Sequence, residues 1–337
     1  MTGPYPSTPA PTIYDVARAA DVAPSTVSRA FSRPGRVSAG TVTRIRAVAD
    51  ELGYHPNPIA RALSTSRTHM IAVIVSDVGN PFHAELVRGA QEAARNAGFV
   101  VILGDAQESG VREREALDRV LPVVEGAIIG SSRMTDAALR DIAGQRPTIV
   151  LNREVDGVAS IVTDNPGGTR AAVGHLRGLG HRAITYVAGP EASWADSVRW
   201  ASLCDAAREH GLETRRIGPV APTFEGGLDA AAGLVSGRPT AVIAYNDLVA
   251  IGVLQGLARA GVRVPDEVSV VGFDDILTSR LVTPALTTVA APIGEMGAAA
   301  VRELLALSEQ GPSDHETSIV MPARLVIRES TGRRRDA

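Results

Sequence analysis

Two short helical segments on either side of a four-residue turn are the feature that most limits how this 337-residue chain can fold. Thr12 opens the first segment with Asp15 three residues on, the spacing of a capping box. Pro24 takes the first position of the second segment, where a missing N–H is tolerated. A third segment runs from Ser38 to Leu52 and is predicted to turn these residues inward: Val42, Ile45, Val48, Ala49 and Leu52. The pattern predicts a small three-helix domain.

The outer face of the second segment carries Ser25, Thr26, Ser28 and Arg29. Arginine can bond guanine through two hydrogen bonds in the major groove of DNA, and short hydroxyls can reach bases or phosphates. This face therefore predicts a helix that reads DNA. The alternative is a generic helical domain with a solvated polar face.

The charge distribution favours the DNA-binding interpretation. Residues 1–67 contain eight arginines and four acidic residues, a net charge of +4, although the whole chain has a net charge of −3. Arginine is the only basic residue besides histidine, because the sequence contains no lysine. The positive end is where phosphate contacts are expected, and such contacts make affinity fall with salt.

Four sequence segments resemble the LacI/GalR family of bacterial transcription regulators: Y-D-V-A, V-A-P-S-T-V-S-R, R-V-S-A-G-T and G-Y-H-P-N-P-I-A-R-A-L. The resemblance extends from Thr12 to Thr331. It implies a hinge helix over Asn57–Ser64 that lies in the minor groove, with Leu63 as a wedge between base pairs. The alternative is a plain linker over Asn57–Thr68. The predicted DNA contacts are Thr12, Tyr14, Pro24, Ser25, Thr26, Ser28, Arg29, Arg36, Asn57, Ala60 and Leu63.

From Met70 onward, short strand patterns alternate with amphipathic helix patterns in two series. The predicted strands are 71–75, 100–103, 127–129, 148–151, 160–162, 183–188, 241–244 and 268–273. The predicted helices are 84–97, 112–120, 199–210, 226–235 and 247–260. Repeated strand–helix units indicate parallel sheets flanked by helices, and two series indicate two lobes. The resemblance implies the architecture of periplasmic sugar-binding proteins for this body.

Ligands of parallel sheets bind beyond the carboxyl ends of the strands, so the effector-binding candidates follow strands. They are Phe82, His83, Ser131, Asn152, Asp164, Ser193, Trp194, Arg199, Asn246 and Asp274. The resemblance implies that Arg199 bonds effector hydroxyls or carboxylates and that Asp274 is an acidic ligand of the effector. An alternative places Phe82 in the core, and Asp247 is expected to be structural, as a helix cap beside Asn246.

The predicted fold class is α/β: a helix-turn-helix head with a two-lobed body of parallel sheets. The expected boundaries are a disordered tail (1–11), the DNA-binding domain (12–56), a hinge and linker (57–68), the body (69–331) and a tail (332–337). Within the body we expect lobes at about 69–168 and 169–290, with the chain crossing back near its end.

Several classes are disfavoured. The single cysteine, Cys204, excludes a disulfide framework, and no segment has the pattern of a signal peptide or a membrane span, so we expect a cytoplasmic protein. The seven histidines lack a metal-protease spacing, and a chain without lysine has no P-loop. We therefore expect no enzyme activity, no cofactor and no metal.

The sequence thus predicts a transcriptional regulator, with repression as the expected mode. Its expected partners are a near-palindromic double-stranded DNA operator, a small-molecule effector such as a sugar or polyol, and a second copy of the chain as a homodimer. Alternatives are control by a protein coeffector or by a nucleoside or purine, and an extracytoplasmic sugar-binding protein, which would have no use for the head.

Overall fold

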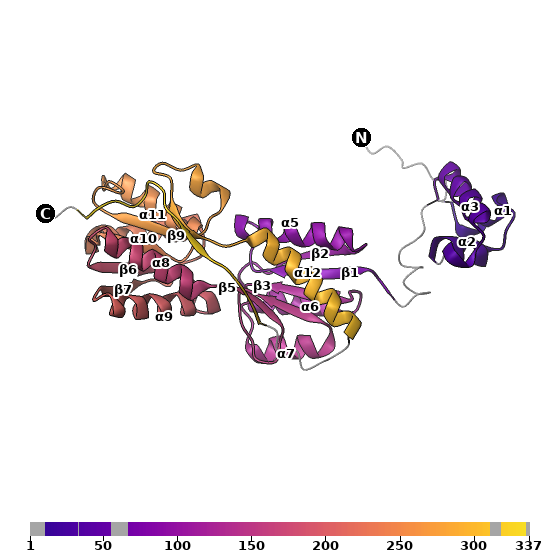
Figure 1. Cartoon of the computed structure of the whole chain (residues 1–337), viewed down its shortest axis with the longest axis horizontal. Coiled ribbons are helices and arrows are strands. Elements are labelled where there is room, and N and C mark those ends of the chain that lie inside the picture. Colours follow the sequence, from indigo (N-terminus) through magenta and orange to yellow (C-terminus); the bar gives the residue numbers. More distant parts are fainter. Residues whose placement is uncertain (1–10, 33, 55–66, 311–317, 335–337) are drawn as a thin grey trace, which may run out of the picture. The chain divides into compact units, whose positions relative to one another are not determined.

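The computed structural model describes residues 11–32, 34–54, 67–310 and 318–334. The chain divides into two compact units, Met1–His69 and Met70–Ala337, which are described separately (Figure 1). No helix within the described ranges is long and apolar enough to cross a membrane.

The head contains helices α1 (Ile13–Ala19), α2 (Pro24–Ser32) and α3 (Ala39–Leu52), with a 3-10 turn, η1 (Pro34–Arg36). Its core consists of Val16, Ala17, Ala20, Val27, Ala30, Val42, Ile45 and Ala49. The expected inward position of Leu52 was wrong: this side chain is 40% exposed in the last turn of α3. Tyr54 packs against the core beyond it, with its ring 6.1 Å from that of Phe31.

The ends of the head helices follow the predicted capping chemistry. The Thr12 N–H donates to the Asp15 carboxylate at 2.9 Å, the return half of a capping box. Ser38 accepts from the Thr41 N–H at 3.3 Å and caps α3. Gly53 ends α3 with φ of 66°, a left-handed conformation that glycine adopts without strain. Local sequence therefore sets the boundaries of this small domain.

The first lobe is built on a parallel six-stranded sheet in the order β11-β5-β4-β3-β1-β2. Its strands are β1 (Met70–Val75), β2 (Val100–Asp105), β3 (Gly126–Gly130), β4 (Thr148–Leu151), β5 (Ser160–Thr163) and β11 (Ser318–Met321). Its helices are α5 (Pro81–Asn96), α6 (Gly110–Val120), α7 (Asp136–Gln145) and α12 (Ile293–Gln310). Ile71, Val73 and Val75 pack with α5 and α12, whereas Ala72 and Ile74 pack with α6 and α7, so helices cover both faces.

The second lobe has the sheet order β12-β10-β9-β8-β6-β7, in which only β12 runs antiparallel. Its strands are β6 (Ala183–Val187), β7 (Glu213–Ile217), β8 (Ala241–Ala244), β9 (Ser269–Asp274), β10 (Thr287–Ala290) and β12 (Arg324–Val326). Its helices are α8 (Asn165–Gly178), α9 (Trp194–Glu209), α10 (Phe224–Gly237), α11 (Asp247–Arg259) and the 3-10 turn η2 (Leu277–Arg280). The predicted α/β fold with two parallel-sheet lobes is confirmed.

The chain passes between the lobes three times: after β5, between β10 and α12, and between β11 and β12. The first crossing lies at Asp164, slightly earlier than the expected boundary near residue 168. The chain crosses back between the lobes twice near its end, which is more than expected. After β10, α12 and β11 belong to the first lobe, and β12 then belongs to the second. Three short crossings are a suitable hinge between two rigid sheets.

Candidate functional site

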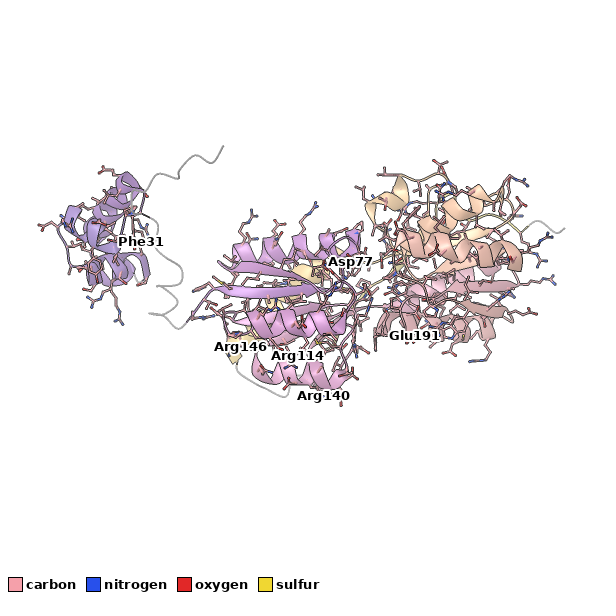
Figure 2. All side chains as sticks on the ribbon, turned by 180° about the vertical axis from the view of Figure 1, so that it is seen from behind. Phe31, Asp77, Arg114, Arg140, Arg146 and Glu191 are labelled. Carbon is pink, nitrogen blue, oxygen red and sulfur yellow. The ribbon has the colours of Figure 1, made fainter. Side chains whose placement is uncertain are left out.

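The carboxyl ends of the parallel strands of the two lobes face each other. Figure 2 shows Asp77, just after β1, and Glu191, just after β6, where the lobes meet, whereas Arg146, just before β4, lies at the far end of its lobe. A cavity at this junction has the following lining: Ser76, Asn80, Phe82, His83, Glu108, Ser131, Arg133, Asn152, Arg199, Pro222, Tyr245, Asn246 and Asp274. Its volume is about 20 Å³, which is room for about one water molecule, so the lining residues must move apart to admit a larger ligand.

Seven of the ten predicted effector residues line this one cavity. They are Phe82, His83, Ser131, Asn152, Arg199, Asn246 and Asp274. They come from positions up to 192 residues apart in the sequence, and the strand ends bring them together. The remaining three lie outside the lining.

Those three residues begin helices instead. Asp164 caps α8 by accepting from the Gly167 N–H at 2.8 Å. Ser193 caps α9, and its hydroxyl lies 3.0 Å from the hydroxyl of Tyr245. Trp194 is the first residue of α9. Because a loop after a strand commonly ends in a helix cap, strand-end position alone did not separate caps from cavity residues.

The first-lobe wall is formed by loops that follow β1, β3 and β4. Asn80 caps α5 by accepting from the Phe82 N–H, which fixes Phe82 and His83 in the first turn. The two rings meet edge to face at 5.1 Å, and both side chains are buried. Burial lowers the pKa of His83, so the ring is neutral at pH 7.

Two other first-lobe residues reach the cavity from strained backbone. Ser131 follows β3 with φ of 54°, and Asn152 follows β4 with φ of 57°. Left-handed conformations are uncommon for residues other than glycine and collect at functional sites. The Asn152 amide nitrogen lies 3.5 Å from the Ser131 hydroxyl, and the His83 Nε2 lies 3.4 Å from the same oxygen.

The second-lobe wall is organised around Arg199 on α9. Its Nε donates to the Asn165 side chain at 2.8 Å, and a terminal nitrogen donates to the Tyr245 carbonyl at 2.6 Å. The guanidinium carbon lies 3.5 Å from the centre of the Phe273 ring, a cation–π contact. Asn165 lies at the first crossing between the lobes, so Arg199 ties the cavity to the hinge.

Asp274 is the only acid paired with Arg199 among the described residues, at 3.7 Å. Burial raises the pKa of Asp274 to about 8, and the nearby Arg199 opposes this shift. No hydrogen bond to the Asp274 carboxyl is present within the described part of the chain beyond this long ion pair. Its oxygens are therefore available to a ligand that donates hydrogen bonds.

Asp247 has the expected structural role, but it does not cap a helix. Asn246, not Asp247, caps α11 by accepting from the Val249 N–H at 2.9 Å. The fully buried Asp247 carboxylate accepts from the Ile276 N–H and the Ser279 and Thr288 hydroxyls at 2.5–3.0 Å. These bonds join α11, η2 and β10 beneath the cavity.

Six lining residues were not predicted: Ser76, Asn80, Glu108, Arg133, Pro222 and Tyr245. Arg133 donates to Glu108 at 2.7 Å and to the Ser131 carbonyl at 3.0 Å. Tyr245 directly follows β8 and precedes Asn246, so the strand-end rule would have found it. Arg133 follows β3 by three residues, and no local pattern distinguishes it from a surface arginine.

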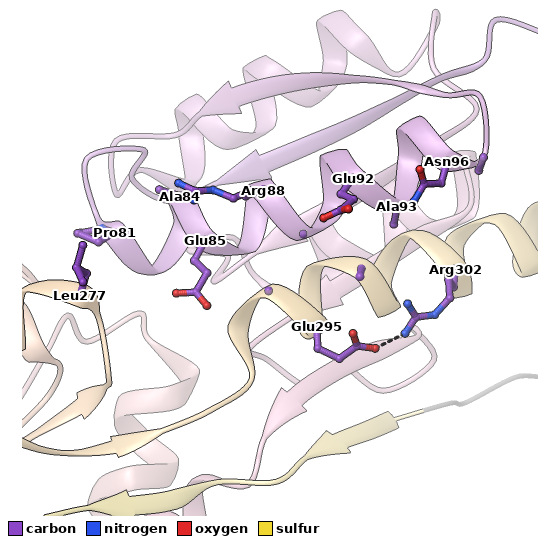
Figure 3. Close-up of a pocket in the computed structure, with 14 residues that line it drawn as sticks. Pro81, Ala84, Glu85, Arg88, Glu92, Ala93, Asn96, Leu277, Glu295 and Arg302 are labelled. Carbon is purple, nitrogen blue, oxygen red and sulfur yellow. Dashed lines mark hydrogen bonds and ion pairs between the residues drawn. The ribbon is translucent and has the colours of Figure 1, made fainter.

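A groove larger than the interlobe cavity lies elsewhere, between α5 and α12 on the first lobe (Figure 3). It has a volume of about 960 Å³ and includes Glu85, Arg88 and an ion pair between Glu295 and Arg302. The lining is mostly helix surface, and Leu277 is its one contribution from the second lobe. The small interlobe cavity, with its buried convergent polar groups, fits a small-molecule site better.

The head presents the predicted DNA-facing side chains on its surface. Pro24 opens α2 as expected, while Ser25 and Arg29 are exposed and Thr26 and Ser28 are half-buried. Thr12, Tyr14 and Arg36 are also exposed. Tyr14 is 65% exposed, which is unusual for an aromatic ring without a partner surface. The predicted hinge contacts Asn57, Ala60 and Leu63 lie outside the described residues.

Candidate cofactor or metal ligands do not gather anywhere in the described ranges: no group of three or more His, Cys, Asp or Glu side chains there could hold a metal ion. A helical head with an exposed reading face, joined to a body with a buried polar cavity between two lobes, describes a ligand-responsive DNA-binding protein.

Comparison with known proteins identifies the family. The model for bacterial regulatory proteins of the lacI family matches residues 12–57, and that for a periplasmic binding protein-like domain matches residues 173–331. The regulator DegA of Bacillus subtilis is 33% identical over 95% of this chain and 98% of its own. The repressor CytR of Escherichia coli is 33% identical over 96% of both. The chain therefore belongs to the LacI family of DNA-binding transcriptional regulators, which are not enzymes, as the sequence predicted.

Similar solved structures include the lac repressor and other transcriptional regulators. The lac repressor dimer bound to operator and the anti-inducer ONPF has a TM-score of 0.86 and 27% identity, covering 96% of this chain and 99% of that one. A LacI family regulator from Enterococcus faecium with bound ribose has a TM-score of 0.71 and 30% identity, covering 79% and 100%. A complex of the regulator CelR with cellobiose has a TM-score of 0.71 and 29% identity, covering 95% and 99%.

Proposed function

We propose that this protein is a cytoplasmic repressor whose affinity for an operator is controlled by a small molecule, a sugar or related polyol, bound in the interlobe cavity. The observation that carries the proposal is the convergence of Arg199 and Asp274 from the second lobe with His83, Ser131 and Asn152 from the first. Charge-assisted bonds on one side and neutral polar groups on the other suit hydroxyls.

The same geometry suggests a mechanism. The cavity draws residues from both lobes, so a ligand that binds there favours one relative position of the lobes. Operator affinity then changes only by the ligand's differential binding to the two states. We propose a homodimer acting on a near-palindromic operator, because the lac repressor bound to operator is a dimer.

The proposed DNA contacts remain Thr12, Tyr14, Arg36 and the exposed face of α2, together with Asn57, Ala60 and Leu63. Arg29 at this face predicts at least one guanine in each half-site. Selection of bound duplexes from a random pool with the full-length protein would identify the operator. Recovery of a palindromic sequence with guanine in each half would support the proposal, whereas enrichment of no sequence would contradict it.

Calorimetry with neutral sugars tests the effector half of the proposal. We expect heat of binding with at least one sugar, and a change in operator affinity at the same concentration. The matched variant Arg199→Ala removes the centre of the second-lobe wall. Arg208→Ala on the same helix is its control, because the Arg208 side chain forms an exposed surface ion pair with Asp205. Equal sugar binding by both variants would contradict the site.

A protein coeffector is the second candidate function. The observation that favours it is the α5–α12 groove, which is larger than the interlobe cavity and carries Arg88 and Arg302. A partner bound there would act through the first lobe. In that case Arg302→Ala would remove regulation in cells, and the sugar panel would give no heat with the wild-type protein.

A further inference from the structure

Arg133 and Tyr245 line the cavity from opposite lobes, and their side chains meet there. Arg133 follows β3 in the first lobe, and Tyr245 follows β8 in the second. The guanidinium lies beside the Tyr245 hydroxyl, close enough for a hydrogen bond. The Arg133 side chain is 6% exposed and Tyr245 is 7% exposed. A charge-assisted contact that is shielded from water in this way is stronger than one at the surface.

The first lobe holds the Arg133 side chain in this position. Its Nε donates to the Glu108 carboxylate at 2.7 Å, and a terminal nitrogen donates to the Ser131 carbonyl at 3.0 Å. The backbone N–H of Arg133 donates to the buried Glu113 on α6 at 2.9 Å. A guanidinium has five N–H donors in a fixed plane, so Arg133 can keep its two side-chain bonds and still offer donors to the second lobe.

The second lobe holds Tyr245 at three points. Its hydroxyl lies 3.0 Å from the hydroxyl of Ser193, the cap of α9. Its carbonyl accepts from Arg199 at 2.6 Å. Its ring packs so closely on Gly189 that a Cβ there would lie 2.5 Å from the ring. Tyr245 therefore cannot follow Arg133 when the lobes move apart, and separation of the lobes breaks the contact.

We infer that Arg133 and Tyr245 form a latch, which holds the two lobes together in the absence of an effector and which an effector must break to enter the cavity. Each partner is fixed within its own lobe, so the contact exists in one relative position of the lobes. The cavity has room for about one water molecule, so its lining must move apart to admit a sugar. The latch lowers the population of the open, binding-competent form. Its role in effector entry rests on the proposed function, whereas the latch itself does not.

Three single variants isolate the latch. Tyr245→Phe removes the hydroxyl and keeps the ring and the carbonyl with their contacts within the second lobe. Arg133→Met removes the guanidinium and keeps a long side chain. Arg114→Met is the matched control, because Arg114 is outside the cavity lining and forms ion pairs within the first lobe, with Asp118 at 2.8 Å and Asp141 at 2.7 Å.

Hydroxyl-radical footprinting of the full-length protein without sugar measures the separation of the lobes. Phe82 and His83 line the cavity on the first lobe and are 4% and 3% exposed, so both are shielded while the lobes are together. Tyr245→Phe removes one oxygen from the opposite lobe, so faster oxidation of Phe82 and His83 in this variant reports separation of the lobes. We expect faster oxidation in Tyr245→Phe and in Arg133→Met, no further increase in the double variant, and the wild-type rate in Arg114→Met.

Stopped-flow binding measures effector entry, with the best binder among ribose, galactose and cellobiose as the probe. A hydrogen bond to a charged group is worth enough to change the open population about 10–100-fold. We therefore expect the sugar to associate about 10–100-fold faster with Tyr245→Phe and Arg133→Met than with the wild type. Arg114→Met should associate at the wild-type rate.

The outcomes separate the latch from the proposed function. Unchanged oxidation of Phe82 and His83 in Tyr245→Phe and Arg133→Met would overturn the latch, whatever the sugars do. Faster oxidation with an unchanged association rate would overturn its role in effector entry. Binding of none of the neutral sugars would overturn the proposed function, and the oxidation rates would still decide the latch. Thermal melting of each variant confirms that the compared proteins are folded.

Discussion

The two walls of the interlobe cavity differ in how completely the protein satisfies its own polar groups. In the second lobe, Arg199 and Asn246 are each held by two hydrogen bonds within the protein. In the first lobe, Asn152 and Ser76 have unpartnered polar atoms, and the contacts around Ser131 are 3.4–3.5 Å long. The difference indicates that Arg199 and Asn246 are positioned in advance by the protein, whereas Asn152 and Ser76, like the carboxyl of Asp274 in the second lobe, have polar atoms without a hydrogen-bond partner among the described residues.

The largest effect is expected from Arg199→Ala, which removes the side chain at the centre of the second-lobe wall. The substitution leaves Asp274 without its cation and Asn165 without its donor, inside a buried site. We expect the free energy of unfolding to fall by about 3–5 kcal/mol, because two buried charge-assisted hydrogen bonds and the cation–π contact with Phe273 are lost, and we expect sugar binding to be lost. Chemical denaturation measures the first effect. Arg208→Ala, on the same helix, should change stability by no more than about 0.5 kcal/mol.

Asp247→Asn and Asp274→Asn test which of these two second-lobe acids stabilises the fold and which one binds sugar. Asp247 accepts three hydrogen bonds, and an amide replaces one of the two accepting oxygens with a donor, so at least one of these bonds is lost or reversed and we expect a loss of about 1–3 kcal/mol in unfolding free energy. Asp274 accepts none of these bonds, so Asp274→Asn should melt close to the wild type and bind sugar weakly. The reverse order of melting temperatures would contradict the assignment.

Gly189→Ala tests whether the position of the Tyr245 ring in the second-lobe wall matters for sugar binding. A Cβ at Gly189 would lie 2.5 Å from the Tyr245 ring, which lines the cavity. The ring would have to shift, and overpacking of this kind typically destabilises a protein by about 1–3 kcal/mol. We expect weaker sugar binding that Tyr245→Ala in the same chain partly restores. Unchanged affinity in Gly189→Ala would show that the ring position is unimportant.

The smallest predicted effect is a pH dependence of sugar affinity that belongs to the second wall. Hydroxyls that donate to Asp274 favour its ionised form, so binding lowers the pKa from about 8 and releases a proton. Affinity should therefore rise as pH increases from 6 toward 8 and level off above it. Calorimetry in buffers of different ionisation enthalpy would detect the proton. If Asp274→Asn still released a proton on sugar binding, that proton would come from another group.

Sequence patterns predicted those parts of the molecule that depend on local chemistry. The capping pair Thr12 and Asp15, Pro24 at the start of α2, and strands such as β4 and β8 lie where their patterns place them. The missed α8 begins N-P-G-G, a typical turn sequence. Its Gly168 is required by packing, since a Cβ there would lie 2.5 Å from Val289 on β10, and the sequence does not reveal this contact.

Prediction of the site residues from the sequence has the same limit. Strand ends identified Ser131 and Asn152, and the family resemblance identified Arg199 and Asp274, all of which line the cavity. The edge strand β7, E-T-R-R-I, was missed because it is largely exposed and has no apolar alternation. Arg133 was missed because its burial depends on Glu108, which is 25 residues away in the sequence. Long-range pairing of this kind is set by the fold and not by any local pattern.

Control of operator affinity by a small molecule in the interlobe cavity can be measured directly. Fluorescence anisotropy with the selected operator duplex, with and without the best-binding sugar, tests it most directly. We expect a change in operator Kd of about 5–150-fold, the usual range of allosteric coupling, and loss of this change in Asp274→Asn. An operator Kd that is the same at zero and saturating sugar, in a protein that demonstrably binds both, would contradict the account.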